Sequence, residues 1–318
     1  MFTVAACLDT PQLRRALVLS LFLTSLVPWG IAAWYLYIGY LPELVQGYYR
    51  LDGGYMSSHD NAHSMALFAG FGALYLFQTK DWRVRILLWI YTIGCIIFLY
   101  YTYVRNPILG MIVFLPIWLL LEGRFTLLVT TVAVGAIVFT TNTVFMDRFG
   151  DIGRLFGEVG NKSTDDVGSG RVFMWTRTMT NYLNQPAVYQ VFGRGLGGQV
   201  ILGPTGRLDA HNDYLTLLCS TGVVSVACYL WFQGLVLLHA WRVRQRAADP
   251  WLRSFANMMI ALQFHVTITN FSSNSYVSRI NISWFLWALV GVLFAESLKL
   301  ASGHQRLAAS TTPAMSAA

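Results

Sequence analysis

The sequence predicts an all-α fold, a polytopic membrane helix bundle of about eight transmembrane helices with one long, partly helical periplasmic loop. Of its 318 residues, 55% are hydrophobic and 12% are charged, which is more apolar surface than one soluble core can bury. Eight stretches are apolar over roughly the 17 to 25 residues that a helix needs to cross a hydrocarbon layer of about 30 Å. Between the fifth and sixth stretch, the apolar pattern stops for about 70 residues.

The expected spans follow one another with short connections. They cover residues 16–38, 62–79, 86–104, 107–121, 125–143, 214–239, 255–271 and 280–298. Residues 1–142 therefore hold the first five helices, residues 143–212 the periplasmic loop, and residues 213–300 the last three. The small, polar residues 301–318 predict a disordered cytoplasmic tail.

The positions of Lys and Arg predict the orientation, because short cytoplasmic loops carry an excess of them. With a cytoplasmic N-terminus, one side collects most of the basic residues outside the long loop, whereas the short outer segments hold Arg50, Arg105 and Arg279. Both termini are then cytoplasmic. The net charge of +7 lies mainly in these inner loops, so it does not predict nucleic-acid binding. The four cysteines show no spacing typical of a disulfide or a metal site.

The middle of the long loop predicts a helix that begins after Ser169 and stops before Pro186. Its apolar stripe consists of Val172, Trp175, Met179 and Leu183. Arg171 falls in the first turn, where backbone N–H groups already favour an anion. An ion pair of Arg171 with Asp165 or Asp166 is an equally good interpretation of the spacing.

Two further stretches of the loop contain groups suited to binding or turning. The glycines of 193–198 permit a close backbone approach to a ligand, although a plain turn is the simpler interpretation. The loop ends in Asp209-Ala210-His211-Asn212-Asp213. His211 can exchange a proton near neutral pH, Asp209 or Asp213 can orient its ring, and Asn212 can bind a sugar hydroxyl. A helix cap by Asn212 or Asp213 is the alternative.

Polar residues also mark the outer ends of other spans. Arg105 faces either lipid headgroups or a polar cavity. His59, Asp60, Asn61 and His63 begin the second span; two histidines make a weak metal site, so we expect a capped helix start with Asn61 contacting a sugar. Another polar rim follows the seventh span. We expect these groups to share a water-filled mouth.

The order of these features resembles the O-antigen ligase and Wzy polymerase superfamily over about residues 59–234. The motifs that carry the resemblance are Arg105, Ser169-Gly170-Arg171-Val172-Phe173-Met174-Trp175, Gly195-Leu196-Gly197-Gly198, and His211-Asn212-Asp213-Tyr214-Leu215. The continuation 218–224 fits the helix interrupted at glycine that is typical of this family. Family members usually have several more N-terminal spans, so the chain looks like the later part of a typical member.

The resemblance implies a glycosyltransferase of the bacterial inner membrane, with its active site facing the periplasm. Its donor would be an undecaprenyl-diphosphate-linked glycan, and its acceptor a saccharide or lipid core in O-antigen or exopolysaccharide assembly. Arg105 and Arg171 would stabilise the leaving diphosphate without a metal or cofactor, and His211 would be the base. Arg177, Arg194, Arg207 and Trp175 are weaker candidates for substrate contact.

Two alternatives remain from the sequence. Polymerase and ligase differ only in the acceptor, and polymerisation is slightly favoured; other polysaccharide-assembly proteins are conceivable partners. A lipid-linked oligosaccharide transporter or flippase is the alternative from another class. Such proteins usually carry polar groups near the bilayer midplane and internal repeats, whereas the polar groups here gather at one face.

Overall fold

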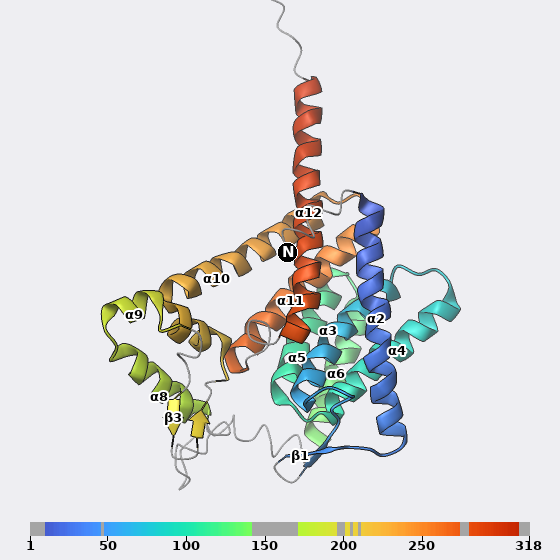
Figure 1. Cartoon of the computed structure of the whole chain (residues 1–318). Helices are drawn as coiled ribbons and strands as arrows, with labels where there is room; N and C mark the ends of the chain where they lie inside the picture. Colours follow the sequence, from blue (N-terminus) through green and yellow to red (C-terminus); the bar gives the residue numbers. More distant parts are fainter. Residues whose placement is uncertain are drawn as a thin grey trace, which may run out of the picture. The chain divides into compact units, whose positions relative to one another are not determined.

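The chain is a helical protein with two small β-hairpins (Figure 1). The structure is a computed structural model that describes residues 10–45, 48–141, 171–195, 201–203, 206–208, 211–273 and 280–311. The predicted helical class is confirmed. The hairpins were not predicted, because each strand has only three residues, too few for an alternating pattern to show in the sequence.

The described elements follow the predicted order. The helices are α2 (Pro11–Tyr37), α3 (Ser58–Leu76), α4 (Trp82–Tyr101), α5 (Arg105–Leu121), α6 (Phe125–Thr141), α8 (Arg171–Leu183), α9 (Ala187–Phe192), α10 (Asp213–Arg246), α11 (Pro250–Ser272) and α12 (Ile280–Thr311). The antiparallel hairpins pair β1 (Glu43–Val45) with β2 (Tyr48–Arg50), and β3 (Ile201–Gly203) with β4 (Gly206–Leu208).

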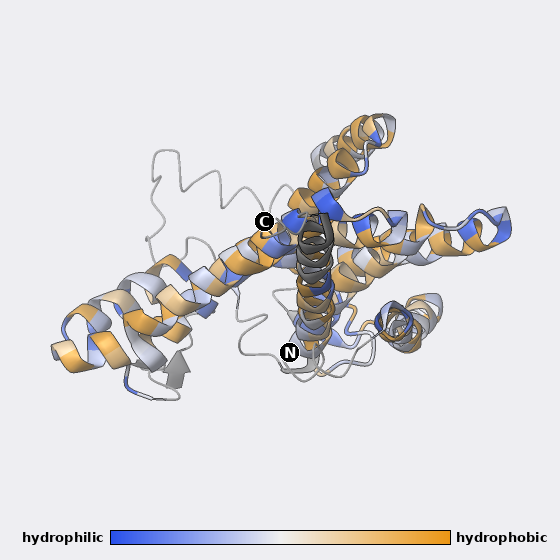
Figure 2. Cartoon of the chain, turned by 90° about the horizontal axis from the view of Figure 1, so that it is seen from above, coloured by the Kyte–Doolittle hydropathy of each residue, from blue (hydrophilic) through white to orange (hydrophobic). Residues whose placement is uncertain are grey.

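Four helices of the described chain are long and apolar enough to cross a membrane: α2, α4, α10 and the part of α12 from Ile282 to Ala301. Figure 2 shows hydrophobic residues along most of the helices, with hydrophilic residues gathered toward ends and turns. The other expected spans also form helices, but α5 and α6 are shorter apolar helices. The protein is therefore a membrane protein, and the count of about eight spans stays a prediction.

The chain divides into two compact units. The first unit comprises Met1–Thr102, Gly234–Gln263 and Trp284–Ala318, and the second comprises Tyr103–Gln233 and Phe264–Ser283. Helices α10, α11 and α12 each pass from one unit to the other. All described parts of the predicted loop belong to the second unit.

In the first unit, α3 is buried along almost its whole length. It packs closely on α4, since a Cβ on Gly72 would lie 2.3 Å from Thr92 Oγ1. Phe68 and Phe71 of α3 contact Phe285 of α12. These contacts make α3 the centre of the unit's apolar core.

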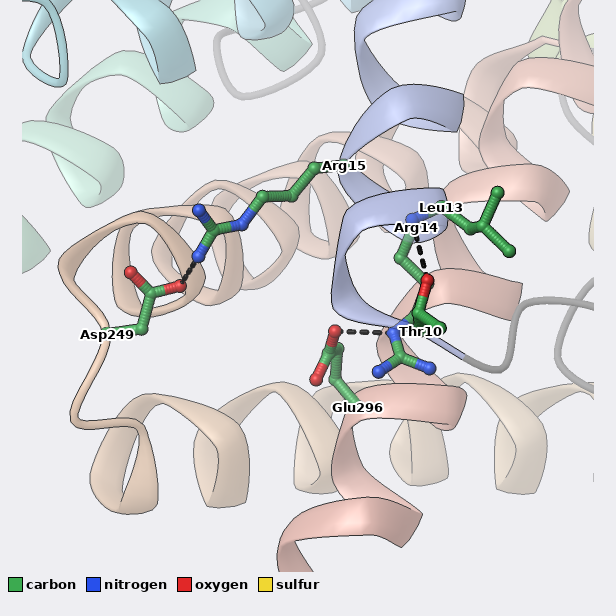
Figure 3. A network of polar contacts seen from close by, with 6 residues as sticks. All are labelled: Thr10, Leu13, Arg14, Arg15, Asp249 and Glu296. Atoms are coloured by element: carbon green, nitrogen blue, oxygen red, sulfur yellow. Dashed lines mark hydrogen bonds and ion pairs between the residues drawn. The ribbon is translucent and has the colours of Figure 1, made fainter.

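Two ion pairs hold the start of α2 in the same unit (Figure 3). Arg14 is fully buried and pairs with Glu296 of α12 at 2.5 Å, whereas Arg15 pairs with Asp249 at the exposed surface. Buried pairs are sensitive to the loss of one partner, because the other charge is then left in an apolar environment. Surface pairs contribute at most about 1 kcal/mol. The Arg14–Glu296 pair therefore links α2 to α12 through a buried contact that the loss of either partner would disrupt.

In the second unit, α10 folds back on itself at Gly222. The hydroxyl of Tyr214 lies 3.4 Å from Gln233 Oε1, although nineteen residues of straight helix would separate them by about 28 Å. Gly222 has φ 79° and ψ 177°, a conformation open essentially only to glycine. Figure 1 shows this reversal beside α9. The helix interruption implied by the family resemblance is thus a sharp turn.

The backbone after α9 forms hydrogen bonds with the end of the first half of α10, just before the turn at Gly222. The N–H groups of Arg194 and Gly195 donate to the carbonyl oxygens of Cys219 and Ser220, at 3.0 and 2.8 Å. These carbonyls end a half-helix and would otherwise lack partners. The predicted turn at residues 193–195 is therefore a cap for α10; residues 196–200 lie outside the described part.

The loop helix α8 occupies the predicted position, and its fully buried residues lie beside the apolar stripe. Its buried residues are Thr178 and Tyr182, whereas Leu183 of the predicted stripe is 60% exposed. Tyr182 points inward because its hydroxyl donates to the carbonyl oxygen of Gln190 at 2.6 Å. Helical spacing places Arg171 on this inward face, since residues 171, 175, 178 and 182 share one side of a helix.

The helix α12 continues to Thr311, and the disorder of the tail stays a prediction. The segment after Ala301 contains good helix formers such as Gln305, Arg306 and Leu307. A helix that is already formed extends into such residues at little cost, since only its nucleation is expensive. Residues 312–318 lie outside the described part.

The turn in α10 predicts a large difference between two Gly→Ala substitutions. A Cβ on Gly222 would lie 2.0 Å from the carbonyl oxygen of Val191, whereas a Cβ on Gly234 meets nothing within 4 Å. We expect Gly222→Ala to lower the free energy of unfolding by about 2 kcal/mol or more. Gly234→Ala should raise it by roughly 0.5–1 kcal/mol. Thermal unfolding of both variants in detergent measures this, and equal Tm values would contradict the close approach.

Candidate functional site

The last turn of α11 is the point at which three other helices of the second unit meet. The last four carbonyl groups of an α-helix have no partner within that helix. In α11 these belong to Thr269, Asn270, Phe271 and Ser272. Two of these carbonyls accept hydrogen bonds from asparagine side chains on α5 and at the start of α10.

Asn106 joins α5 to this turn. Its buried side-chain amide donates to the carbonyl oxygen of Thr269 at 2.7 Å, and its Oδ1 accepts from the hydroxyl of Ser272 at 2.6 Å. Arg105 is the first residue of α5 and stays partly exposed beside this anchor. Two residues earlier, Tyr103 has a positive φ of 51°. The backbone before Arg105 is therefore held in a conformation that non-glycine residues seldom adopt.

Asn212 joins α10 to the same turn. Its amide nitrogen donates to the carbonyl oxygen of Phe271 at 2.7 Å, and its Oδ1 accepts from the N–H of Leu215 at 3.0 Å. Asn212 is therefore the N-cap of α10. Both ends of its amide are used within the protein, which favours the helix-cap interpretation over direct contact with a sugar hydroxyl.

His211 precedes this cap and is exposed. Its φ is 46°, and in the described part of the chain only Tyr103 and His211 combine a side chain with a positive φ. Such strained residues cluster at functional sites when the surroundings hold them in place. Here the buried Asn212 supplies that support for the backbone, so His211 is held at the surface of the second unit.

Helix α8 reaches the same turn through an aromatic contact. The rings of Trp175 and Phe271 meet edge to face, with centroids 5.3 Å apart. Arg171 begins α8 one turn before Trp175. Burial, and next the positive charge of the nearby Arg105, lower the pKa of Arg171 to about 10. It remains cationic at neutral pH, although both its burial and the charge of Arg105 disfavour this form.

The combined arrangement favours a bound anion. The N-termini of α5, α8 and α10 carry partial positive charge, and each is linked to α11 or to Arg105 by the contacts described above. Arg105 and Arg171 add two full charges at two of these N-termini. A diphosphate would relieve the repulsion between them and accept their hydrogen bonds.

The remaining predicted residues of this unit occupy more varied places. Asp213 is fully buried in the first turn of α10, where a carboxylate stabilises a helix start. Arg177 and Arg194 are exposed and lie over the rings of Phe173 and Tyr189. The side chain of Arg207 and the whole of Asp209 lie outside the described part of the structure, as do Asp165 and Asp166.

Asn61 belongs to the first unit. Its buried amide donates to the carbonyl oxygen of Leu51 at 3.1 Å. Ser57 accepts from the N–H of Asp60 at 3.3 Å and so caps α3, which confirms the predicted capped helix start. Within the described residues, no three His, Cys, Asp or Glu side chains gather in a way that would hold a metal ion.

Sequence reasoning missed Asn106 and Phe271, the two residues that connect the predicted ones. Asn106 follows Arg105 directly. An asparagine at the start of a helix often forms hydrogen bonds with nearby backbone, and this position could have indicated its role. Phe271 gave no signal, since a phenylalanine at the end of an apolar helix is ordinary. Next to Phe271, the side chain of Asn270 donates to the hydroxyl of Tyr229 at 2.7 Å. This hydrogen bond is a second contact between α11 and α10.

Comparison with known proteins agrees with the predicted superfamily. Residues 90–230 match the model of a protein family described as O-antigen ligase. This stretch contains Arg105, Arg171 and His211, and the resemblance to the O-antigen ligase and Wzy polymerase superfamily is thereby confirmed. No curated protein matches the chain.

The burial of Arg171, and next its closeness to Arg105, predict that this arginine lowers the stability of the protein without ligand. Its pKa is lower in the folded chain than in the unfolded chain. Below about pH 10, where the side chain is charged in both states, Arg171 therefore lowers the free energy of unfolding. Arg171→Gln should raise Tm by roughly 2 °C. Inorganic pyrophosphate should raise the Tm of the unsubstituted chain and have little effect on the variant.

The control for this measurement is Arg83→Gln, which removes an exposed arginine from the first unit. It should leave both Tm and the pyrophosphate effect unchanged. The anion site at Arg105 and Arg171 would be contradicted by a Tm of Arg171→Gln below that of the unsubstituted chain. It would also be contradicted if pyrophosphate raised the Tm of Arg171→Gln as much as that of Arg83→Gln.

Proposed function

We propose that this O-antigen ligase-type protein is a membrane glycosyltransferase that moves a glycan from an undecaprenyl diphosphate carrier to a saccharide acceptor. The observation that carries the proposal is the meeting of Arg105, Arg171 and the strained His211 around the end of α11. All three lie in the region that matches the O-antigen ligase family.

Arg105 and Arg171 bind the leaving diphosphate in this proposal. As the bond between the anomeric carbon and the phosphate oxygen breaks, its electron pair stays on the diphosphate. Fixed guanidinium groups and helix N-termini stabilise the developing charge most when they are already in place. Because the two arginines repel each other when no anion is bound, binding of the diphosphate gains free energy by relieving that repulsion, and the gain grows as negative charge develops on the leaving group.

His211 accepts the proton of the acceptor hydroxyl. The hydroxyl oxygen forms the new bond to the anomeric carbon, and its proton passes to the imidazole. A histidine is suited to this step because its ordinary pKa lies near neutral pH. Asn212 does not touch the reacting atoms in this scheme; it is a positioning residue that caps α10 and holds His211.

The site faces the periplasm if the basic side of the protein is cytoplasmic. The donor then reaches the site from the outer leaflet of the inner membrane, with its diphosphate at headgroup level. Arg177 and Arg194, which are exposed on the same unit, are candidates for contact with more distant sugars or phosphates. Polymerisation of surface polysaccharide is slightly favoured over ligation to a lipid core.

His211→Ala is expected to lower glycan transfer by about 10²- to 10⁴-fold, since the base is lost, while the protein still folds and inserts. The measurement is transfer by purified protein in detergent from a radiolabelled lipid-linked glycan to a saccharide acceptor. His239→Ala is the matched control, because His239 bonds Ser297 in the first unit. Full activity of His211→Ala would contradict the mechanism.

The same substitution also separates the candidate activities in cells. Loss of long surface chains with single units still attached indicates a polymerase, and loss of all attached chains indicates a ligase. Failure of the unsubstituted protein to form a glycosidic bond in detergent, together with loss of surface chains in cells, would favour a transporter, since transport needs a membrane.

A further inference from the structure

The short helix α9 exposes an apolar surface that the proposed chemistry does not use. None of its residues is buried. The exposed side chains of α9 and of the end of α8 are Leu183 (60%), Val188 (57%), Tyr189 (43%) and Phe192 (68%). Large exposed apolar groups that lie close together usually mark an interaction surface.

This surface is held rigidly, so its exposure is not that of a loose loop. The Gln190 side chain donates to the carbonyl oxygens of Leu183 and Gln185, at 3.0 and 2.9 Å. The hydroxyl of Tyr182 donates to the carbonyl oxygen of Gln190. The polar side of α9 is therefore used against α8, and its apolar side is turned away.

The surface is also adjacent to a helix that is apolar enough to cross a membrane. Gly193 packs against the backbone of Ser220, and Gly222 against that of Val191, so α9 lies beside the turn of α10 (Figure 1). The large apolar side chains that α10 exposes after this turn include Val223, Val224, Leu230 and Trp231. The first charged residue in α10 after Asp213 is Arg242.

We infer that α9 lies in the boundary between lipid headgroups and acyl chains, and that the partner of this surface is the membrane itself. Lipid must cover the exposed apolar side of a spanning helix, and α9 packs against the turn at Gly222, directly before the exposed Val223 and Val224 of α10. The guanidinium of Arg194 lies 5.8 Å from the ring centre of Tyr189. A tyrosine beside an arginine suits the headgroup layer, because the ring can contact acyl chains while the guanidinium contacts lipid phosphates.

This contact would fix the depth of the candidate site relative to the bilayer. Helix α9 is bonded to the end of α8 and to the turn of α10, and Arg171 lies at the other end of α8. An anchor at α9 therefore keeps α8 at a set distance from lipid phosphates. The inference does not rest on the proposed glycosyl transfer, since its test measures depth and not activity.

The test is the depth of a nitroxide label on Phe192→Cys or Val188→Cys. The full chain carries Cys7→Ser and Cys228→Ser, while Cys95 and Cys219 are buried. It is placed in vesicles of phosphatidylethanolamine and phosphatidylglycerol. Oxygen, which concentrates in lipid, and a water-soluble nickel chelate then report what surrounds the label. A chain without an added cysteine gives the background.

Labels at residues 192 and 188 should be several-fold more accessible to oxygen than to the nickel chelate, as should a lipid control at Trp231→Cys. Thr180→Cys, on the exposed polar side of α8, should show the reverse. Greater access for the chelate at both α9 positions would overturn the inference. Access for neither reagent would also overturn it, because a protein segment would then cover α9.

Discussion

The second unit depends on the carbonyl groups at the end of α11, which have no hydrogen-bond partners within their own helix. Thr269 and Phe271 offer two of them, and the amides of Asn106 and Asn212 satisfy both. Leaving such groups unpaired away from water costs about 1–3 kcal/mol each. Each asparagine is next to a proposed catalytic residue, Arg105 or His211. The hydrogen bonds that complete α11 therefore also position the site.

The same arrangement places positive charge where it is unfavourable without a ligand. Burial disfavours the charged form of Arg171 most, and the nearby positive charge of Arg105 disfavours it further. The backbone at Tyr103 and His211 is strained as well. Proteins keep such features where the surroundings hold them and where they serve binding. An anionic leaving group is the ligand that would remove most of the repulsion.

The sequence predicted the helical class, the capped start of α3 and the helix at Arg171, because these depend on local patterns. It left open whether Asn212 caps a helix or binds a sugar, since a capping asparagine and a binding one occupy the same position. It did not indicate that Thr178 and Tyr182 are the buried residues of α8, because the Tyr182–Gln190 bond depends on α9. It could not pair Asn106 with Thr269, since 163 residues separate them and no local pattern records such a contact.

The most direct test of this account is whether α8 packs on the end of α11 in the membrane. Trp175 and Phe271 make that contact, with ring centres 5.3 Å apart. In a chain without the native cysteines, a short flexible bismaleimide should cross-link Trp175→Cys to Phe271→Cys, whereas it should not cross-link Thr180→Cys to Phe271→Cys. If the first pair were not cross-linked under conditions in which the protein is folded and both thiols react, Arg171 would not be held at this site, and the account would be contradicted.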